Sequence, residues 1–350
     1  MRSYIIAEMA WGYTGSYETA LEILDFVSNS RANAVGIHIT DMDTYMTKDY
    51  KCKAGQTLSA RDEDNTNISV YDYLNKINMS QSDWLQFDKK ATELGVDIVA
   101  MCNDLESFHF SKKLNIKRYV IAASLFYEYK LLHSIVKHNN NVIIRIGGAS
   151  LTEIDDIISY IFSVDKKSKI NLLAGIQLYP TPIEQLHINS IKLLIERYKG
   201  QKVTLGLADH IDGDHPYAIY LPALALAYGI ETIEKHITTD RSIKLEDFEA
   251  ALSGNQFKEF VEFIRTVEIA LGNESLDYLV NPQNEKYRLV LRKRVVAGRN
   301  IKSGIIITED MLVFMRCDTG VELEYLDQII GKISKRNIEQ HEGISFNDVE

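Results

Sequence analysis

The chain has 350 residues, of which 45% are hydrophobic and 25% charged, and its formal net charge is -10. This length accommodates one large domain and one small one, and the negative charge argues against a nucleic-acid-binding surface. No apolar run approaches the roughly 20 residues of a membrane span. The first residues lack the apolar core of a signal peptide, and the three cysteines show no pairing or zinc spacing. We therefore expect a cytoplasmic protein without disulfides and without membrane or nucleic-acid partners.

Short β-type segments alternate with helical segments through most of the chain. Strands are expected at residues 4–7, 34–39, 97–102, 118–123, 141–146, 170–176, 203–209 and 232–238. Helices are expected at residues 16–27, 81–94, 108–114, 126–138, 151–162, 183–197, 221–229 and 248–271. This alternation implies a parallel sheet, and eight strands at this length favour a closed (β/α)₈ barrel over an open doubly wound sheet. No Gly-x-Gly-x-x-Gly follows the first strand, which counts against a dinucleotide-binding domain.

Three regions depart from this alternation. Residues 41–80 are polar and aromatic with weak periodicity, and they are either an excursion over the barrel mouth or a purely structural insertion. Residues 272–288 are irregular and predict a linker, and from residue 289 short strands and turns replace the barrel pattern. We expect a barrel domain at 1–275, a linker at 276–288 and a small domain at 289–350.

Two polar clusters follow neighbouring strands near the end of the barrel. The strand at 203–209 delivers Asp209 and His210, and the strand at 232–238 delivers Glu234, Lys235 and His236. The carboxyl ends of adjacent parallel strands meet at one edge of a sheet, which is the functional face of a barrel. Two histidines at that edge predict a metal site.

Several motifs, read together, resemble those of the sialic acid synthase family. They are Ile5-Ile-Ala-Glu8, Tyr179-Pro-Thr-Pro182, Gly206-Leu-Ala-Asp-His-Ile-Asp-Gly213 and Glu234-Lys-His-Ile-Thr-Thr-Asp-Arg-Ser242. The stretch at residues 295–312 is similar to the antifreeze-like SAF domain that follows the barrel in these enzymes. The resemblance implies a nonulosonic acid synthase, which condenses phosphoenolpyruvate with an N-acylated amino-sugar aldose to give a nine-carbon 2-keto acid and phosphate.

The resemblance also implies a divalent metal, Mn²⁺ or Mg²⁺, on two histidines that match His210 and His236. Such an ion polarises the aldehyde of the open-chain sugar. Counting back from His236 without a gap reaches His215 instead, so His215 remains an alternative to His210, which directly follows its strand. Glu8 resembles a sugar-contacting position of the family, and we expect it to be catalytic together with His210 and His236.

Further residues are carried over as substrate contacts, and the partners follow from the same resemblance. The expected substrate-binding residues are His38, Asp104, Arg145, Gln177, Tyr179, Glu234, Lys235, Asp247 and Arg316. In the family the SAF domain reaches over the barrel of the partner subunit in a domain-swapped homodimer and lends an arginine to the sugar. Arg316 is the candidate for that arginine here, beside Arg292 and Arg294.

The part of the site that would bind the donor substrate, phosphoenolpyruvate, departs from the family pattern; we call it the donor half. Gly36 stands where the family has a lysine, residues 120–125 lack a second lysine and a glutamate, and Arg145 replaces a serine. Arg145 is a candidate to replace the lost groups, because a guanidinium grips phosphate or carboxylate in two contacts. Two alternatives remain open: a related metal-dependent barrel with another donor, such as an aldolase or isomerase, and a degenerate sugar-binding scaffold.

Overall fold

The computed structural model describes residues 2–50, 69–273 and 275–350. The chain divides into two compact units, residues 1–272 and 273–350. Each unit has its own hydrophobic core. None of the helices in the described ranges is long and apolar enough to cross a membrane.

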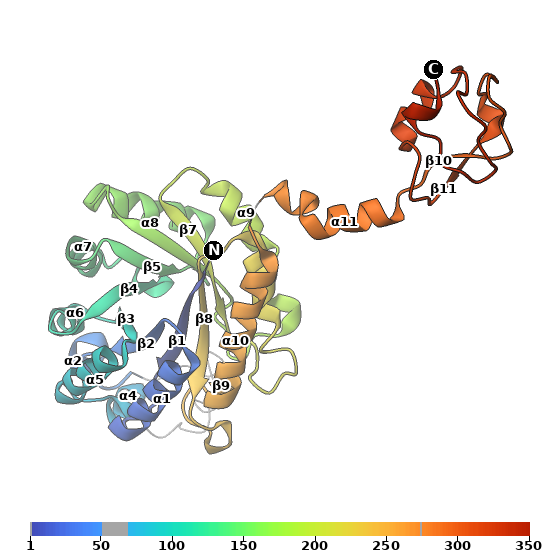
Figure 1. The fold of residues 1–350 in the computed structure, drawn as a ribbon. Coiled ribbons are helices and arrows are strands. Elements are labelled where there is room, and N and C mark those ends of the chain that lie inside the picture. Colours follow the sequence, from blue (N-terminus) through green and yellow to red (C-terminus); the bar gives the residue numbers. More distant parts are fainter. Residues whose placement is uncertain (1, 51–68, 274) are drawn as a thin grey trace. The chain divides into compact units, whose positions relative to one another are not determined.

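The first unit is a closed barrel (Figure 1). Within the described residues, eight parallel strands pair in sequence order, and the last returns to pair with the first. These strands are β1 (Tyr4–Ala10), β2 (Ala34–Ile39), β3 (Asp97–Cys102), β4 (Ile116–Ala122), β5 (Asn141–Arg145), β6 (Lys169–Ala174), β7 (Val203–Asp209) and β8 (Thr232–Thr238). A two-residue strand, β9 (Leu252–Ser253), extends β8. The predicted (β/α)₈ barrel is therefore confirmed.

Helices follow the strands and cover the outside of the barrel (Figure 1). They are α1 (Tyr17–Ser30), α5 (Gln81–Leu94), α6 (Leu105–Ser111), α7 (Tyr129–His138), α8 (Leu151–Val164), α9 (Ser190–Arg197) and α10 (Gly254–Leu271). Ser16, Ser80 and Ser150 accept backbone hydrogen bonds at the starts of α1, α5 and α8, as N-caps do. The helix expected after β7 is a 3₁₀ helix, η3 (Leu221–Tyr228), with Pro222 in its first turn. Shorter 3₁₀ turns are η1 (Ala123–Leu125), η2 (Ile183–Gln185) and η4 (Arg241–Ile243).

The lower part of the barrel interior is filled by apolar side chains. They form a separate cluster, which we call the apolar plug: Ile6, Ala34, Val99, Met101, Val120, Ile143, Leu173 and Ala208. A packed interior of this kind leaves no channel, so polar chemistry is confined to the carboxyl ends of the strands.

Between β2 and α5, the described residues include two short helices, α2 (Met42–Tyr45) and α4 (Val70–Ile77). Residues 51–68 lie outside the described part of the chain. The interpretation of residues 41–80 as an excursion over the barrel mouth therefore stays a prediction.

The second unit begins with helical turns. These are η5 (Leu276–Val280) and α11 (Pro282–Leu291), so the expectation of an irregular stretch at 272–288 is wrong. Asn281 caps α11, and Pro282 occupies its first turn, where the fixed proline backbone suits a helix start. An antiparallel pair follows, β10 (Arg294–Ala297) and β11 (Leu312–Met315), with the 3₁₀ turns η6 (Glu309–Met311), η7 (Leu323–Gln328) and η8 (Phe346–Asp348).

Candidate functional site

Polar side chains of four strands meet above the apolar plug of the barrel. Glu8 comes from β1, His38 from β2, Arg145 from β5, and Glu234 and His236 from β8. Glu234 and His236 share one face of β8 because strand side chains alternate. Four of these groups are buried although they are polar, and the fifth, His38, is partly buried, so each needs a partner within the cluster or in a ligand.

Arg145 is the centre of this cluster. Its Nη2 donates to Glu234 Oε2 at 2.9 Å and also to Glu8 Oε2. Arg145 is 6% exposed, and each glutamate is 1% exposed. Gly36 makes this arrangement possible, since a Cβ at residue 36 would lie 2.5 Å from Glu8 Oε2. The space that a side chain at residue 36 would fill is thus taken by the carboxylate that holds Arg145.

Several buried atoms of the cluster have hydrogen-bonding capacity to spare. Arg145 Nε, His38 Nε2 and Glu234 Oε1 have no hydrogen-bond partner in the described part of the protein. Arg145 Nη1 has only a sulfur contact, 4.0 Å from Met101 Sδ. Buried polar atoms without partners are uncommon, so these atoms indicate a site that a polar ligand completes.

His210 and His236 lie side by side at the ends of β7 and β8. Their ring centroids are 5.4 Å apart. His210 Nδ1 is 2.7 Å from the Ile176 carbonyl oxygen, and a carbonyl only accepts, so Nδ1 carries the proton. Nε2 of His210 is then unprotonated and keeps its lone pair. This is the tautomer in which Nε2 can bind a metal.

Burial lowers the pKa of His210 to about 3 and holds the pKa of His236 well below its ordinary value. Both imidazoles are therefore neutral, the form that binds metal. No group of three His, Cys, Asp or Glu side chains suited to a metal occurs among the described residues. The two imidazoles could therefore supply only two ligands of a divalent cation, and its other ligands would have to come from elsewhere. His215 lies in the following loop, where its Nδ1 accepts from the Tyr217 N–H.

Tyr179 and Gln177 border the histidine pair. The Tyr179 ring centroid lies 4.4 Å from that of His210 and 5.5 Å from that of His236. Its hydroxyl donates to Gln177 Oε1 at 2.7 Å. Asp247 is electrostatically coupled to Tyr179, and burial, followed by Glu246 and Glu8, raises the pKa of Asp247 to about 7. Burial also raises the pKa of Glu234 to about 7, against the opposing effect of Arg145.

Two of the predicted substrate contacts lie apart from this cluster. Asp104 caps α6 by accepting from the Ser107 N–H at 2.7 Å, and it also accepts from the Asp41 N–H. Lys235 lies on the opposite face of β8 from Glu234 and His236, and its Nζ is 2.7 Å from Asp209 Oδ2. Arg316 follows β11 in the second unit and is exposed there.

Two neighbouring residues were not among the predicted site residues. The Trp11 ring meets His38 edge-on at 6.2 Å, and its backbone N–H bonds the Asp247 carboxylate. Arg241 pairs with Asp212 and Asp214, so it ties the loop after β7 to the segment after β8. Arg241 could have been recognised from its place in the Thr239-Asp-Arg-Ser242 motif. For Trp11 the sequence offered only its position shortly after Glu8.

Lys235→Met tests whether Lys235 has a structural rather than a ligand-binding role. The change leaves Asp209 as an unpaired buried carboxylate, which costs about 3–5 kcal/mol. We expect a large fall in the denaturation midpoint of the barrel. Lys192→Met on the exposed surface of α9 is the control and should leave the midpoint unchanged. An unaltered midpoint in Lys235→Met would contradict the structural role.

Comparisons with known proteins match both units. Residues 24–275 match the model of the NeuB family, and residues 292–350 match that of the SAF domain. The chain is 26% identical to a pseudaminic acid synthase of Campylobacter jejuni (strain 81-176), over 99% of this chain and 96% of the relative. It is 24% identical to an N,N'-diacetyllegionaminic acid synthase of Campylobacter jejuni (strain ATCC 700819), over 97% of this chain and 98% of the relative.

Solved structures with the same fold include the N-acetylneuraminic acid synthetase of Leptospira borgpetersenii in complex with citrate. It superposes with a TM-score of 0.68 at 23% identity, covering 82% of this chain and 92% of that one. A putative spore coat polysaccharide biosynthesis protein E of Chromobacterium violaceum gives a TM-score of 0.76 at 20% identity, covering 99% of both chains. Because the family match spans most of the barrel, the protein belongs to the NeuB family and carries a C-terminal SAF domain.

Proposed function

We propose that the protein is a nonulosonic acid synthase. It condenses phosphoenolpyruvate and water with an N-acylated amino-sugar aldose, of the N-acetylmannosamine or diacetamido-trideoxyhexose type, to a nine-carbon 2-keto acid and phosphate. The observation that carries the proposal is the pair of neutral, oriented histidines beside the buried Arg145 cluster at the barrel mouth. The sugar-acid synthases among the relatives support it.

His210 and His236 are the residues that would hold a divalent metal, Mn²⁺ or Mg²⁺. When bound, such an ion supplies Lewis-acid polarisation of the aldehyde oxygen. The Ile176 carbonyl fixes the His210 ring for this role, and Tyr179 packs against both imidazoles. Tyr179, Gln177 and Asp247 would then bind the hydroxyl and amide groups of the sugar.

Arg145 is the proposed anchor for the anionic donor. Its Nε and Nη1 have no oxygen partner among the described residues, so both can donate to a phosphate or carboxylate oxygen. Glu8 and Glu234 hold the guanidinium through Nη2 and thereby fix its direction. Glu8, the residue expected to be catalytic, thus acts on the donor through Arg145.

A second candidate keeps the metal and sugar sites but uses a different donor. The observation that favours it is charge: Arg145 already faces two carboxylates, and Gly36 stands where a lysine would add a cation. A dianionic phosphate would meet less positive charge at this cluster than at a lysine-lined one.

Phosphate release from phosphoenolpyruvate, measured with a panel of amino sugars and Mn²⁺, tests the proposal. Release that depends on one sugar supports the synthase. No release with any sugar, while metal stays bound, would favour the enzyme with another donor. Loss of both metal and sugar binding would favour a sugar-binding scaffold.

Arg145→Lys keeps the charge but removes the planar fork. We expect KM for phosphoenolpyruvate to rise by roughly tenfold or more, with a smaller change in KM for the sugar. Arg118→Lys is the matched control, because Arg118 stacks on Tyr4 at the amino-terminal end of the barrel, 4.0 Å from the ring centroid. Equal effects of the two substitutions on KM for phosphoenolpyruvate would contradict the role of Arg145.

Removing either imidazole of the pair should abolish manganese binding. We expect His210→Ala and His236→Ala to lose bound Mn²⁺ after dialysis, because one histidine alone cannot anchor the ion. His215→Ala should keep it, since His215 lies in the loop and contacts Tyr217. Elemental analysis checks this; full metal content in His236→Ala would overturn the assignment.

The assembly we propose is a cytoplasmic homodimer in which the SAF domain of one subunit supplies Arg316 to the sugar bound by the other. The exposed apolar side chains of α11, Leu289, Val290 and Leu291, support a subunit contact in this region. Light scattering at micromolar concentration should give the mass of a dimer. A monomer would contradict the arrangement.

A further inference from the structure

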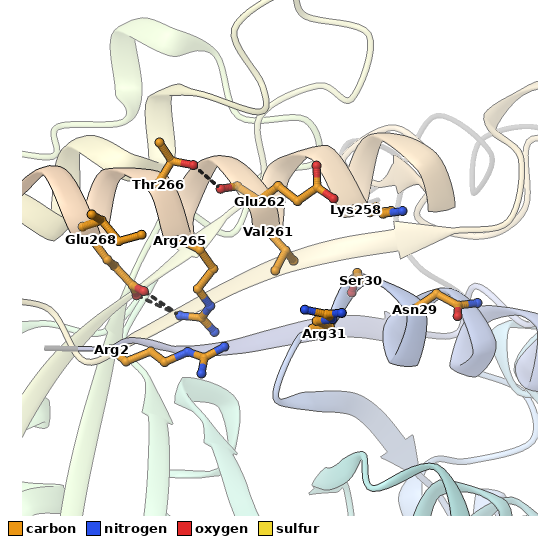
Figure 2. Close-up of a pocket in the computed structure, with 11 residues that line it drawn as sticks. Arg2, Asn29, Ser30, Arg31, Lys258, Val261, Glu262, Arg265, Thr266 and Glu268 are labelled. Atoms are coloured by element: carbon orange, nitrogen blue, oxygen red, sulfur yellow. Dashed lines mark hydrogen bonds and ion pairs between the residues drawn. The ribbon is translucent and has the colours of Figure 1, made fainter.

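A second cavity lies between α10 and the carboxyl end of α1 (Figure 2). Its volume is about 900 Å³, which lies within the range of small-molecule sites. Arg2, Arg31, Lys258 and Arg265 line it, and Val261 and Ile269 contribute apolar surface. We call this cavity the α1–α10 groove.

The groove lies at the opposite end of the barrel from the histidine pair. Arg2 precedes β1, and Arg31 ends α1 just before β2 begins. Glu268 of α10 accepts from the Ser3 N–H at 2.7 Å, which places this part of α10 beside the start of β1. A ligand in the groove therefore cannot reach the proposed reaction centre.

The groove is rich in positive charge although the chain as a whole carries -10. Its four cations face two carboxylates, Glu262 and Glu268. Glu268 is engaged with Arg265, at 2.8 Å. The side chains of Arg2, Arg31 and Lys258 make no ion pair or hydrogen bond with any described residue, so their charges are available to a ligand.

Arg2, Arg31 and Lys258 are exposed, and all three line one concave surface. Figure 2 shows the side chains of Arg2 and Arg265 extending toward each other beside α10, and Arg31 lies at the end of α1 next to this space. Arg31 occupies the left-handed position that ends α1, at φ +61°, where glycine is the usual residue. Cations gathered in a concave surface repel one another and attract an anion.

We propose that the α1–α10 groove binds a small polyanion with at least two phosphate or carboxylate groups. Arg2, Arg31 and Lys258 contact the charged groups, and Val261 and Ile269 contact the carbon skeleton. The ligand joins the first helix of the barrel to the last one, and it stabilises the closed barrel by binding only the folded state. It is an effector or stabilising ligand and not a substrate.

Calorimetric titration of the full-length protein with inorganic pyrophosphate at constant ionic strength tests this site. We expect saturable binding that Arg31→Glu and Lys258→Glu each weaken by roughly tenfold or more, because each removes a charge-assisted contact and adds a repulsive one. Lys192→Glu on α9 makes the same charge change at an exposed lysine without an ion pair and should bind as the unmodified protein does.

The titration has outcomes that would overturn the proposal. Absence of binding to the unmodified protein would do so, as would unchanged affinity in both groove variants, which would place pyrophosphate elsewhere. If Lys192→Glu weakened pyrophosphate binding as much as the groove variants do, the affinity would depend only on the net charge of the protein and not on the groove. A change of oligomeric state in Arg31→Glu, with pyrophosphate affinity unchanged, would identify the groove as a subunit contact instead.

Discussion

The ion pairs of Arg145 with Glu8 and Glu234 are the constraint around which the barrel mouth is built. They join β5 to β1 and β8 across the interior, far from water. Charges so buried are costly unless each is paired and hydrogen-bonded, so the three side chains hold one another in a single arrangement. Around these three charged groups lie the two histidines, Tyr179 and Gln177. Because two carboxylates already face Arg145, the net charge of this group limits how much negative charge of a substrate the site can neutralise.

The architecture and the histidine pair were accessible from the sequence. Strand and helix periodicity is a local property, and the ends of β7 and β8 meet wherever two parallel strands are neighbours. Alternation along β8 also separates Lys235 from Glu234 and His236, although the motif drew all three into one prediction. The 3₁₀ geometry of η3 and the helix α11 depend on packing and capping that periodicity does not reveal.

The pairing of Glu8 with Arg145 could not be predicted from the sequence. The two residues are 137 positions apart and come from strands that are not neighbours in the sheet. Only the closed barrel brings them together. The sequence named both as site residues but could not show that one neutralises the other, and this contact changes the expected role of Arg145 from a free anion clamp to one already held by carboxylates.

Gly36 has a consequence for how this site can change. The Glu8 carboxylate occupies the space that a side chain at residue 36 needs, and that carboxylate is held by Arg145. A lysine introduced at residue 36 would have to displace the Glu8 carboxylate from Arg145. Residues 8, 36 and 145 are therefore coupled, because a side chain at residue 36 requires the Glu8 carboxylate to leave its place beside Arg145.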